Sequence, residues 1–430
     1  MHSFAPEITL ITILSLVILS DAIANKFKIP SVFLLLIGSY LVYTYFKVAV
    51  PIDLASNFST VILFCIPLIF MGDALHLHFK DIKKHAWSIF YLAVVAVGLS
   101  IAIGASLSYF NIFSGLSIGA YVALFAINMA TDAVSVQSVL SRFSGISHDI
   151  KVLIEGESLG NDATAVIAFF FIGLPWMISG TIDPMDATLD ALRVFGVSTA
   201  VGLAIGFAFY MLMNLYSNKR GELFSFIVEA YIAYVLGEEL HISGILTLIV
   251  AIVTTKALVD RDLDYNESKK SKSFLRALNK IQSTSKERLE YIYEMAKEFG
   301  YIASVVIFFA LAEMVNLEKL WEYRVEILIM FLATTMIRAL SMAKFALIGN
   351  KSQHIAPVGV EGWFILTFSG MKGALSIILV HLIPDSYEYK EMFESVTIGV
   401  VVLSIFVYGA TLWTYFTFFK KEKENKLFKS

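Results

Sequence analysis

Charge and cysteine are both scarce in this chain of 430 residues. Asp, Glu, Lys and Arg make up 16% of the sequence, whereas a soluble domain carries roughly 25%. Hydrophobic residues make up 57%. This composition argues against a soluble protein and predicts a polytopic membrane protein. The single cysteine, Cys65, lies within a hydrophobic run, which excludes an intrachain disulfide and any metal site built from several cysteines.

The N-terminal region also lacks a basic stretch before its first hydrophobic run, which covers residues 8–20. A cleaved signal peptide begins with such a stretch, so we interpret this run as a retained first membrane span. The hydrophilic tail after residue 419 is short, and no targeting segment is visible. We therefore expect an integral protein of a prokaryotic plasma (inner) membrane.

Hydrophobic runs long enough to cross a bilayer recur along the whole chain. A transmembrane helix needs about 20 apolar residues, and on that basis we expect about thirteen spans. Their approximate limits are 6–23, 30–46, 58–76, 87–109, 114–141, 150–179, 190–214, 222–238, 241–257, 298–315, 324–348, 361–384 and 392–419. The expected fold class is an all-α polytopic membrane protein with about 13 transmembrane helices.

Basic residues gather in alternate loops between these runs. One set of loops includes Lys80, Lys219 and the basic stretch 256–297, whereas the other set carries acids such as Asp183 and Glu388. Because cytoplasmic loops are enriched in Lys and Arg, we expect the N-terminus outside and the C-terminus in the cytoplasm. The segment 259–297 is then a cytoplasmic loop, and three histidines near the third run, His76, His78 and His85, are expected in a solvated loop.

Two of the runs are interrupted by polar residues or glycines. Residues 128–135 form a polar patch in the fifth run, and residues 369–374 place two glycines around Lys372 in the twelfth run. Interrupted spans at corresponding positions of two halves are typical of secondary transporters built from inverted repeats. We therefore expect two inverted six-helix repeats whose interrupted helices cross at mid-membrane.

The strongest functional signal lies at residues 153–163, where the sixth run begins. Glu157, Ser158, Asn161 and Asp162 are expected at membrane depth, where an ionisable group costs roughly 2.5–3.5 kcal/mol. Ser158 and Asp162 share one helix face because they are four residues apart, whereas Glu157 lies about 140° around the helix from Asp162. We expect Glu157 to pair with Arg338, the only arginine in the middle of a run, in an ion pair that fixes helix packing.

Asp132 and Thr131 offer further oxygen ligands from the interrupted fifth run. Carboxylate, hydroxyl and carbonyl oxygens suit a hard cation rather than a transition metal. A carboxylate that holds either a proton or a cation, but not both, provides the basis of an exchange mechanism. Lys372 could compensate the charge of Asp132 or Asp162.

These residues resemble a known family, the monovalent cation:proton antiporters of the NhaP/NHE type. Glu-Gly-Glu-Ser-Leu-Gly-Asn-Asp at 155–162 is similar to the family's Asn-Asp helix, and residues 130–134 are similar to its Ala-Thr-Asp-Pro-Val segment. Residues 368–376 resemble its Gly-Gly-Leu-Arg-Gly-Ala segment, residues 337–339 its buried-arginine span, and residues 26–38 the start of its second span. The resemblance follows the order and spacing of the whole chain.

The resemblance implies a secondary active antiporter that exchanges Na+ (or Li+) for H+ by alternating access, without a cofactor, as a homodimer in membrane lipid. It implies electroneutral exchange, because Asn161 stands where electrogenic relatives carry a second aspartate. It assigns the exchanged ion or proton to Asp162, sodium coordination to Asp132, Ser158, Asp162 and the Thr131 carbonyl, orientation of the site to Asn161, and ion pairing to Glu157 and Arg338. Residues 1–430 are expected to form a single transporter domain, with a core in 87–179 and 324–419, interface spans in 6–76 and 222–315, and a linker span at 190–214.

Three positions depart from the family pattern. Ala133 replaces a proline, so the interruption of the fifth run must arise without it. Lys372 replaces an arginine and loses its bidentate geometry. Asp73 stands one position later than the acidic residue expected in the third span, a shift of about 100° on a helix, so its access to the site is an open question.

Three other functions are compatible with parts of the pattern. A K+/H+ antiporter would use the same ligand types, because ligand identity alone does not distinguish the two cations. A passive channel could use acidic rings, but the paired interruptions favour a carrier. An intramembrane aspartyl protease also needs two membrane aspartates, yet neither Asp132 nor Asp162 lies in a Gly-x-Gly-Asp context. We therefore expect a transporter rather than an enzyme, with no nucleic-acid partner.

Overall fold

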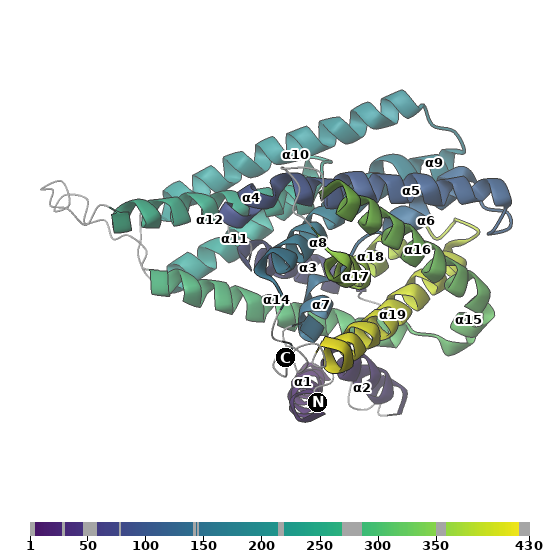
Figure 1. The fold of residues 1–430 in the computed structure, drawn as a ribbon, viewed down its shortest axis with the longest axis horizontal. Helices are drawn as coiled ribbons and strands as arrows, with labels where there is room; N and C mark the ends of the chain where they lie inside the picture. The colour runs from purple at the N-terminus through teal and green to yellow at the C-terminus, as the bar shows by residue number, and fades with distance from the viewer. Residues whose placement is uncertain are drawn as a thin grey trace, which may run out of the picture. The chain divides into compact units, whose positions relative to one another are not determined.

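The computed structural model describes residues 5–27, 31–45, 58–76, 79–140, 143, 146–213, 219–268, 286–349 and 358–420. Within these ranges every regular element is a helix and no strand occurs, which confirms the all-α fold class (Figure 1). The elements are α1 (Ala5–Phe27), α2 (Ser31–Tyr45), α3 (Phe58–His76), α4 (Phe79–Phe90), η2 (Tyr91–Val95), α5 (Ala96–Ser106), η3 (Leu107–Phe110), α6 (Ile118–Ile127), α7 (Ala133–Leu140), α8 (His148–Ala168), η4 (Phe169–Gly173), α9 (Leu174–Ser179), α10 (Pro184–Met213), α11 (Lys219–Glu239), α12 (Gly244–Ser268), α14 (Lys286–Met314), α15 (Leu317–Glu322), α16 (Arg324–Gly349), α17 (Val360–Phe368), α18 (Ala374–His381), α19 (Lys390–Thr414) and η5 (Tyr415–Lys420).

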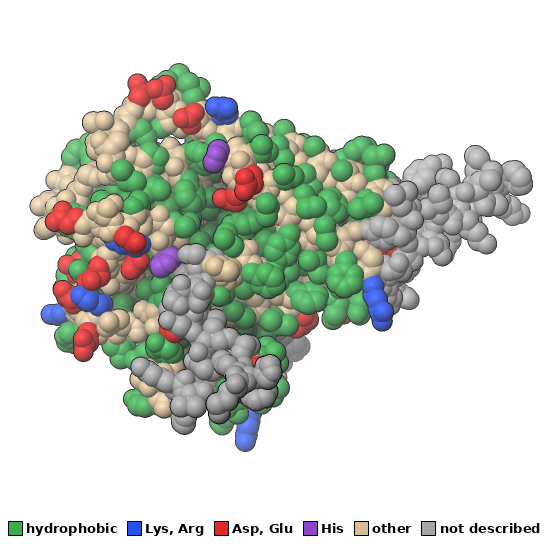
Figure 2. All heavy atoms as spheres, turned by 180° about the vertical axis from the view of Figure 1, so that it is seen from behind, with side chains coloured by type: hydrophobic (Ala, Val, Ile, Leu, Met, Phe, Trp, Pro, Cys, Tyr) green, Lys and Arg blue, Asp and Glu red, His purple; other side chains and the backbone are tan. Residues whose placement is uncertain are grey.

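Several of these helices carry an apolar surface suited to lipid. Among the described residues, seven helical stretches are long and apolar enough to cross a membrane, and three shorter helices are also apolar. Ile18 of α1, Phe207 of α10 and Leu340 of α16 are 70%, 54% and 66% exposed, and hydrophobic side chains spread over much of the face drawn in Figure 2. Extensive apolar exposure is unfavourable in water and marks contact with lipid or a partner. The chain is an integral membrane protein; the count of about thirteen spans stays a prediction.

The chain forms two compact units. Unit 1 consists of residues 1–62, 85–183 and 305–430, and unit 2 consists of residues 63–84 and 184–304. Both predicted core segments, 87–179 and 324–419, fall within unit 1, while the predicted linker 190–214 falls within unit 2. The assignment of core, interface and linker roles to these segments stays a prediction.

The fifth predicted span is divided into α6 and α7 by the non-helical residues 128–132. Asn128 ends α6, and its side-chain amide donates to the Leu124 carbonyl at 2.9 Å. Asp132 directly precedes α7, and its side chain accepts a hydrogen bond from the Ser135 hydroxyl in the first turn of that helix. The polar residues Asn128 and Asp132 thus lie at the two edges of the interruption, which forms with Ala133 at the start of α7.

The twelfth predicted span is divided in the same way into α17 and α18 by residues 369–373. A Cβ atom at Gly370 would collide with the Arg338 guanidinium, and one at Gly373 would collide with the Asp132 side chain. Glycine is therefore required at both positions by close approach of neighbouring groups.

The two interruptions meet in unit 1. The Asp132 amide donates to the Met371 carbonyl at 2.8 Å, and the Lys372 amide donates to the Ser404 hydroxyl of α19 at 2.8 Å. Backbone groups released by a broken helix at membrane depth must find partners in the protein, and these bonds supply them. The crossing of interrupted helices that the sequence predicts is thus formed.

Three expectations for the loops were wrong. The segment 259–297 is not a loop throughout, because α12 continues to Ser268 and α14 begins at Lys286; residues 269–285 lie outside the described part. Lys256, which the sequence analysis counted as the first residue of the basic stretch 256–297, is 1% exposed within α12. His85 is buried in α4, with its Nε2 atom 3.1 Å from Asp149 Oδ1, rather than in a solvated loop.

Candidate functional site

Thr131, in the interruption between α6 and α7, is the meeting point of three side chains from α8. Its amide donates to Asp162 Oδ1 at 3.1 Å, its carbonyl accepts from the Ser158 hydroxyl at 2.9 Å, and its hydroxyl accepts from the Asn161 amide at 2.9 Å. Residues 158, 161 and 162 lie on one side of a helix because they are separated by three and four positions. All four residues are buried. The structure therefore brings these predicted site residues together around a single residue.

Asp132 adds a second carboxylate next to this cluster. Its side chain is half-buried and accepts from the Ser135 hydroxyl at the start of α7. The partial positive charge of a helix N-terminus stabilises a carboxylate at this position. Gly373, from the second interruption, lies directly against the Asp132 side chain. Oxygen atoms from Asp132, Thr131, Ser158 and Asp162 therefore belong to one region of unit 1.

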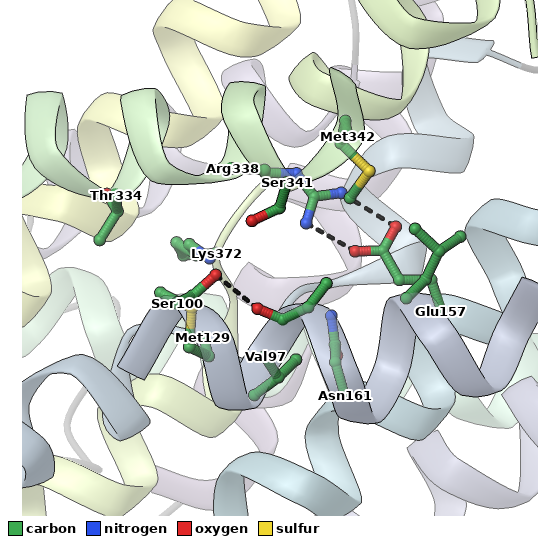
Figure 3. Close-up of a pocket in the computed structure, with 12 residues that line it drawn as sticks. Val97, Ser100, Met129, Glu157, Asn161, Thr334, Arg338, Ser341, Met342 and Lys372 are labelled. Carbon is green, nitrogen blue, oxygen red and sulfur yellow. Dashed lines mark hydrogen bonds and ion pairs between the residues drawn. The ribbon is translucent and has the colours of Figure 1, made fainter. Parts of the chain in front are cut away.

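Glu157 and Arg338 form a bidentate ion pair beside this region (Figure 3). Arg338 Nη1 donates to Glu157 Oε1 at 2.6 Å, and Arg338 Nη2 donates to Glu157 Oε2 at 2.9 Å. The guanidinium also donates to the carbonyls of Leu366 and Thr367 in α17. The Glu157 and Arg338 side chains are 3% and 13% exposed. One pair therefore joins α8, α16 and α17 and neutralises two buried charges.

A small cavity of about 20 Å³ lies between this ion pair and the second interruption. It is lined by Glu157, Asn161, Arg338 and Lys372, together with Ser100 and other residues of α5 and α16 (Figure 3). A cavity of roughly 10–15 Å³ is enough to hold one water molecule. Lys372 is buried, and Asn161 Oδ1 has no hydrogen-bond partner among the described residues. Asn161 thus lies between the Thr131 cluster and a small cavity that Lys372 also lines.

Asp73 lies in α3, within unit 2, whereas the other predicted site residues lie in unit 1. Its side chain is half-buried. A contribution of Asp73 to the site as an accessory charge stays a prediction.

Sequence reasoning assigned no role to a second group of buried ionisable residues, all in unit 2. Glu222 and Glu229 of α11 are fully buried, as is Lys256 of α12, which donates to the Leu75 carbonyl. The seven-residue spacing of Glu222 and Glu229, which places them on one helix face, was the signal available in the sequence. Lys256 gave no such signal because it is followed by many charged residues and therefore resembled the start of a hydrophilic loop.

Crossed, interrupted helices beside a buried carboxylate, in a helical membrane protein, are typical of secondary transporters. Residues 11–417 match the family described as sodium/hydrogen exchanger, transmembrane. The chain belongs to the sodium/hydrogen exchanger family.

Individual relatives agree with this assignment. The Na(+)/H(+) antiporter ApNhaP of Aphanothece halophytica is 27% identical over 354 residues, which are 82% of this chain and 63% of that protein. The low-affinity Na(+)/H(+) antiporter NhaS1 of Synechocystis is 27% identical over 409 residues, 93% of this chain and 71% of that protein. This chain thus spans less than two thirds of the first relative's length.

The fold is also that of a solved structure. The sodium proton antiporter MjNhaP1 from Methanocaldococcus jannaschii, at pH 8, matches with a TM-score of 0.74 and 18% identity, over 96% of this chain and 98% of that chain. At this identity the likeness shows a shared fold and does not by itself define the substrate.

Proposed function

We propose that this protein is a secondary active antiporter that exchanges Na+ (or Li+) for H+ across the membrane. The observation that carries the proposal is the convergence of Asp162, Ser158 and Asn161 on Thr131, at the point where two interrupted helices cross. This convergence collects hard oxygen ligands around a buried carboxylate. Family membership and the names of the relatives support the same function.

In this mechanism Asp162 holds either the proton or the cation. Sodium binds to Asp162, Asp132, Ser158 and the Thr131 carbonyl, so the Ser158 hydroxyl must turn its proton away from that carbonyl when the ion enters. Asn161 keeps the Thr131 hydroxyl in place. Because a proton and a cation compete for one carboxylate, each crossing carries one or the other, and alternating access converts this competition into exchange.

The charges around the site support electroneutral exchange. Asn161 is neutral where a second aspartate would add a further proton, and the Glu157 carboxylate is already neutralised by Arg338. One cation then replaces one proton at Asp162. Lys372 supplies an accessory positive charge in the adjoining cavity. Exchange of K+ for H+ is the second candidate, since the same oxygen ligands accept either cation.

Proteoliposomes carrying a preset pH gradient test this function. Sodium, lithium and potassium are added in turn, and a parallel set is clamped with valinomycin and potassium. We expect sodium or lithium to dissipate the gradient, equally with and without the clamp, and Asp162→Asn to abolish the response while remaining folded. A response to potassium alone would identify K+ as the exchanged cation in place of Na+. Normal exchange by Asp162→Asn would refute the assignment of the site.

The membrane, its orientation and the oligomeric state belong to the same proposal. The distribution of basic residues among the loops favours an external N-terminus and a cytoplasmic C-terminus. The family resemblance favours a homodimer. We place the protein in the plasma membrane of a prokaryote.

A further inference from the structure

A buried carboxyl group in unit 2 takes no part in the proposed exchange site. Glu229 of α11 and Thr255 of α12 are both fully buried. The Thr255 Oγ1 atom lies 2.5 Å from Glu229 Oε1 and 2.9 Å from the carbonyl oxygen of Gly206 in α10. Thr255 therefore connects three helices, α10, α11 and α12, which pack against one another (Figure 1).

The number of hydrogen-bond donors available at Thr255 determines whether Glu229 is protonated. A threonine hydroxyl has one proton to donate, and a backbone carbonyl can only accept. The two contacts of Thr255 are separate, full hydrogen bonds only if Thr255 donates to Gly206 and Glu229 itself donates to Thr255. Glu229 must then carry a proton on Oε1.

Burial leads to the same assignment. Glu229 forms no ion pair within the described residues, and its Oε2 atom has no hydrogen-bond partner there. An ionised carboxylate without a cation is strongly disfavoured in such surroundings, whereas the neutral acid is tolerated. With only Glu229 and Thr255 side-chain oxygens at the junction, a metal ion would lack ligands, and no cluster of metal-binding side chains occurs in the described residues.

The charged groups nearest to Glu229 and Thr255 in sequence on α11 and α12 are Glu222 and Lys256. Glu222, on the same face of α11, is two turns away, about 10 Å along the helix axis. Lys256, beside Thr255 in sequence, donates to the Leu75 carbonyl, and its Nζ atom lies 4.2 Å from the centre of the Tyr293 ring. Tyr293 in turn donates to Asp260 at 3.1 Å. Between Arg193 and its end at Met213, α10 carries no charged residue, and its one titratable side chain there is Tyr210.

The proton also matters for helix packing. α10 approaches α12 closely at Gly206, where a Cβ atom would lie 2.6 Å from the Ala251 carbonyl oxygen. Small residues allow such contacts between membrane helices, and hydrogen bonds across them add to stability. If Glu229 lost its proton, its carboxylate would compete with Gly206 for the Thr255 proton. The hydrogen bond that joins α10 to α12 would then be lost.

We propose that Glu229 is a proton-binding site separate from Asp162, and that its proton holds α10 against α11 and α12 through Thr255. The site binds a proton and no metal ion. It is independent of the exchanged cation, so it stands even if the proposed transport activity is wrong.

Infrared difference spectroscopy of the purified full-length protein at neutral pH tests the proton directly. The wild type should show the carbonyl band of a buried carboxylic acid, which Glu229→Gln removes and the control Glu239→Gln, an exposed position on the same helix, retains. Thr255→Val should shift the band without removing it, because the acid loses its acceptor. A second carboxylic-acid band can come from Asp162, so the wild-type spectrum is compared with that of each variant. Absence of the band from the wild type, or identical carboxylic-acid bands in the wild type and Glu229→Gln, overturns the proposal.

Unfolding as a function of pH provides a second readout that also requires no transport. Above the ordinary pKa of glutamate, the unfolded chain has released the Glu229 proton, whereas the folded protein still holds it. Each further pH unit should then lower the folding equilibrium constant about tenfold, until Glu229 ionises in the folded protein. Glu229→Gln, whose amide can donate to Thr255 at any pH, should remove this contribution, and Glu239→Gln should keep it. Identical pH dependence in wild type and Glu229→Gln overturns the proposal.

Discussion

The Glu157–Arg338 ion pair permits a quantitative test of how this fold tolerates buried charge. Replacing Arg338 with methionine substitutes an uncharged, apolar side chain that still fills much of the same space. The Glu157 carboxylate, which is 3% exposed, is then left without its cation. It also frees the carbonyls of Leu366 and Thr367. Removal of one partner from a buried ion pair costs about 3–5 kcal/mol, so we expect a loss of that size in the free energy of unfolding.

The reciprocal substitution should cost less. In Glu157→Gln the guanidinium keeps its hydrogen bonds to the Leu366 and Thr367 carbonyls, and the Arg338 side chain is more exposed than that of Glu157. Loss of the charge-assisted bonds should cost about 1.5–3 kcal/mol. Combining Glu157→Gln with Arg338→Met removes both charges, so the double variant should be more stable than the sum of the single losses predicts.

The assay is denaturant-induced unfolding in detergent micelles, monitored by circular dichroism, for the wild type, both single variants and the double variant. We expect a coupling energy of about 2 kcal/mol, within the range measured for residues in one ion-pair network. Independent sites add within about 0.5 kcal/mol. The proposed role of the pair, in which each buried charge compensates the other, would be refuted by either of two results. One is that the losses in unfolding free energy of the single variants add to that of the double variant within this limit, and the other is that the two single variants lose equal amounts.

Two further predictions concern other contacts. Gly370→Ala should destabilise the protein by about 1–3 kcal/mol, because the new methyl group meets the Arg338 guanidinium; Gly196→Ala, whose added carbon meets nothing within 4 Å, serves as the control in the same unfolding assay and should be neutral or slightly stabilising. Equal effects of the two substitutions would contradict the close packing at Gly370. The Lys390 ammonium, 2.5 Å from Asp385 Oδ1, holds the pKa of Asp385 below its ordinary value. The stabilisation is therefore present above the ordinary pKa of aspartate and disappears as the pH falls through the lowered one. Lys390→Ala should be less stable than the wild type at neutral pH, with a difference that narrows in acid; a difference that widens in acid would contradict this sign.

The interrupted helices could be predicted from sequence because the polar residues and glycines at the interruptions stand out within hydrophobic runs. Asn128 and Asp132 lie at the ends of α6 and α7, and Gly370 and Gly373 stand where no side chain fits. A polar patch or a pair of glycines inside a hydrophobic run is visible without any knowledge of tertiary structure. The pairing of Glu157 with Arg338 was also accessible, since so few charges lie within the runs that each suggests the other.

The remaining features depend on contacts between distant segments. Lys256 opens a charged stretch, and only the arrival of the Leu75 carbonyl and the Tyr293 ring makes its burial favourable. The protonated state of Glu229 depends on the positions of Thr255 and Gly206, which lie on two other helices. The convergence of three α8 side chains on the separate groups of Thr131 likewise required the relative placement of two segments.

The central claim is that a proton and a sodium ion compete for Asp162, and proton release on sodium binding tests it most directly. Sodium chloride is added to the purified protein in weakly buffered detergent solution near neutral pH, and released protons are counted with a pH indicator while calorimetry measures binding. We predict about one proton released for each sodium ion bound, with both signals lost in Asp162→Asn. Sodium binding without proton release, or unchanged release in Asp162→Asn, would contradict the account.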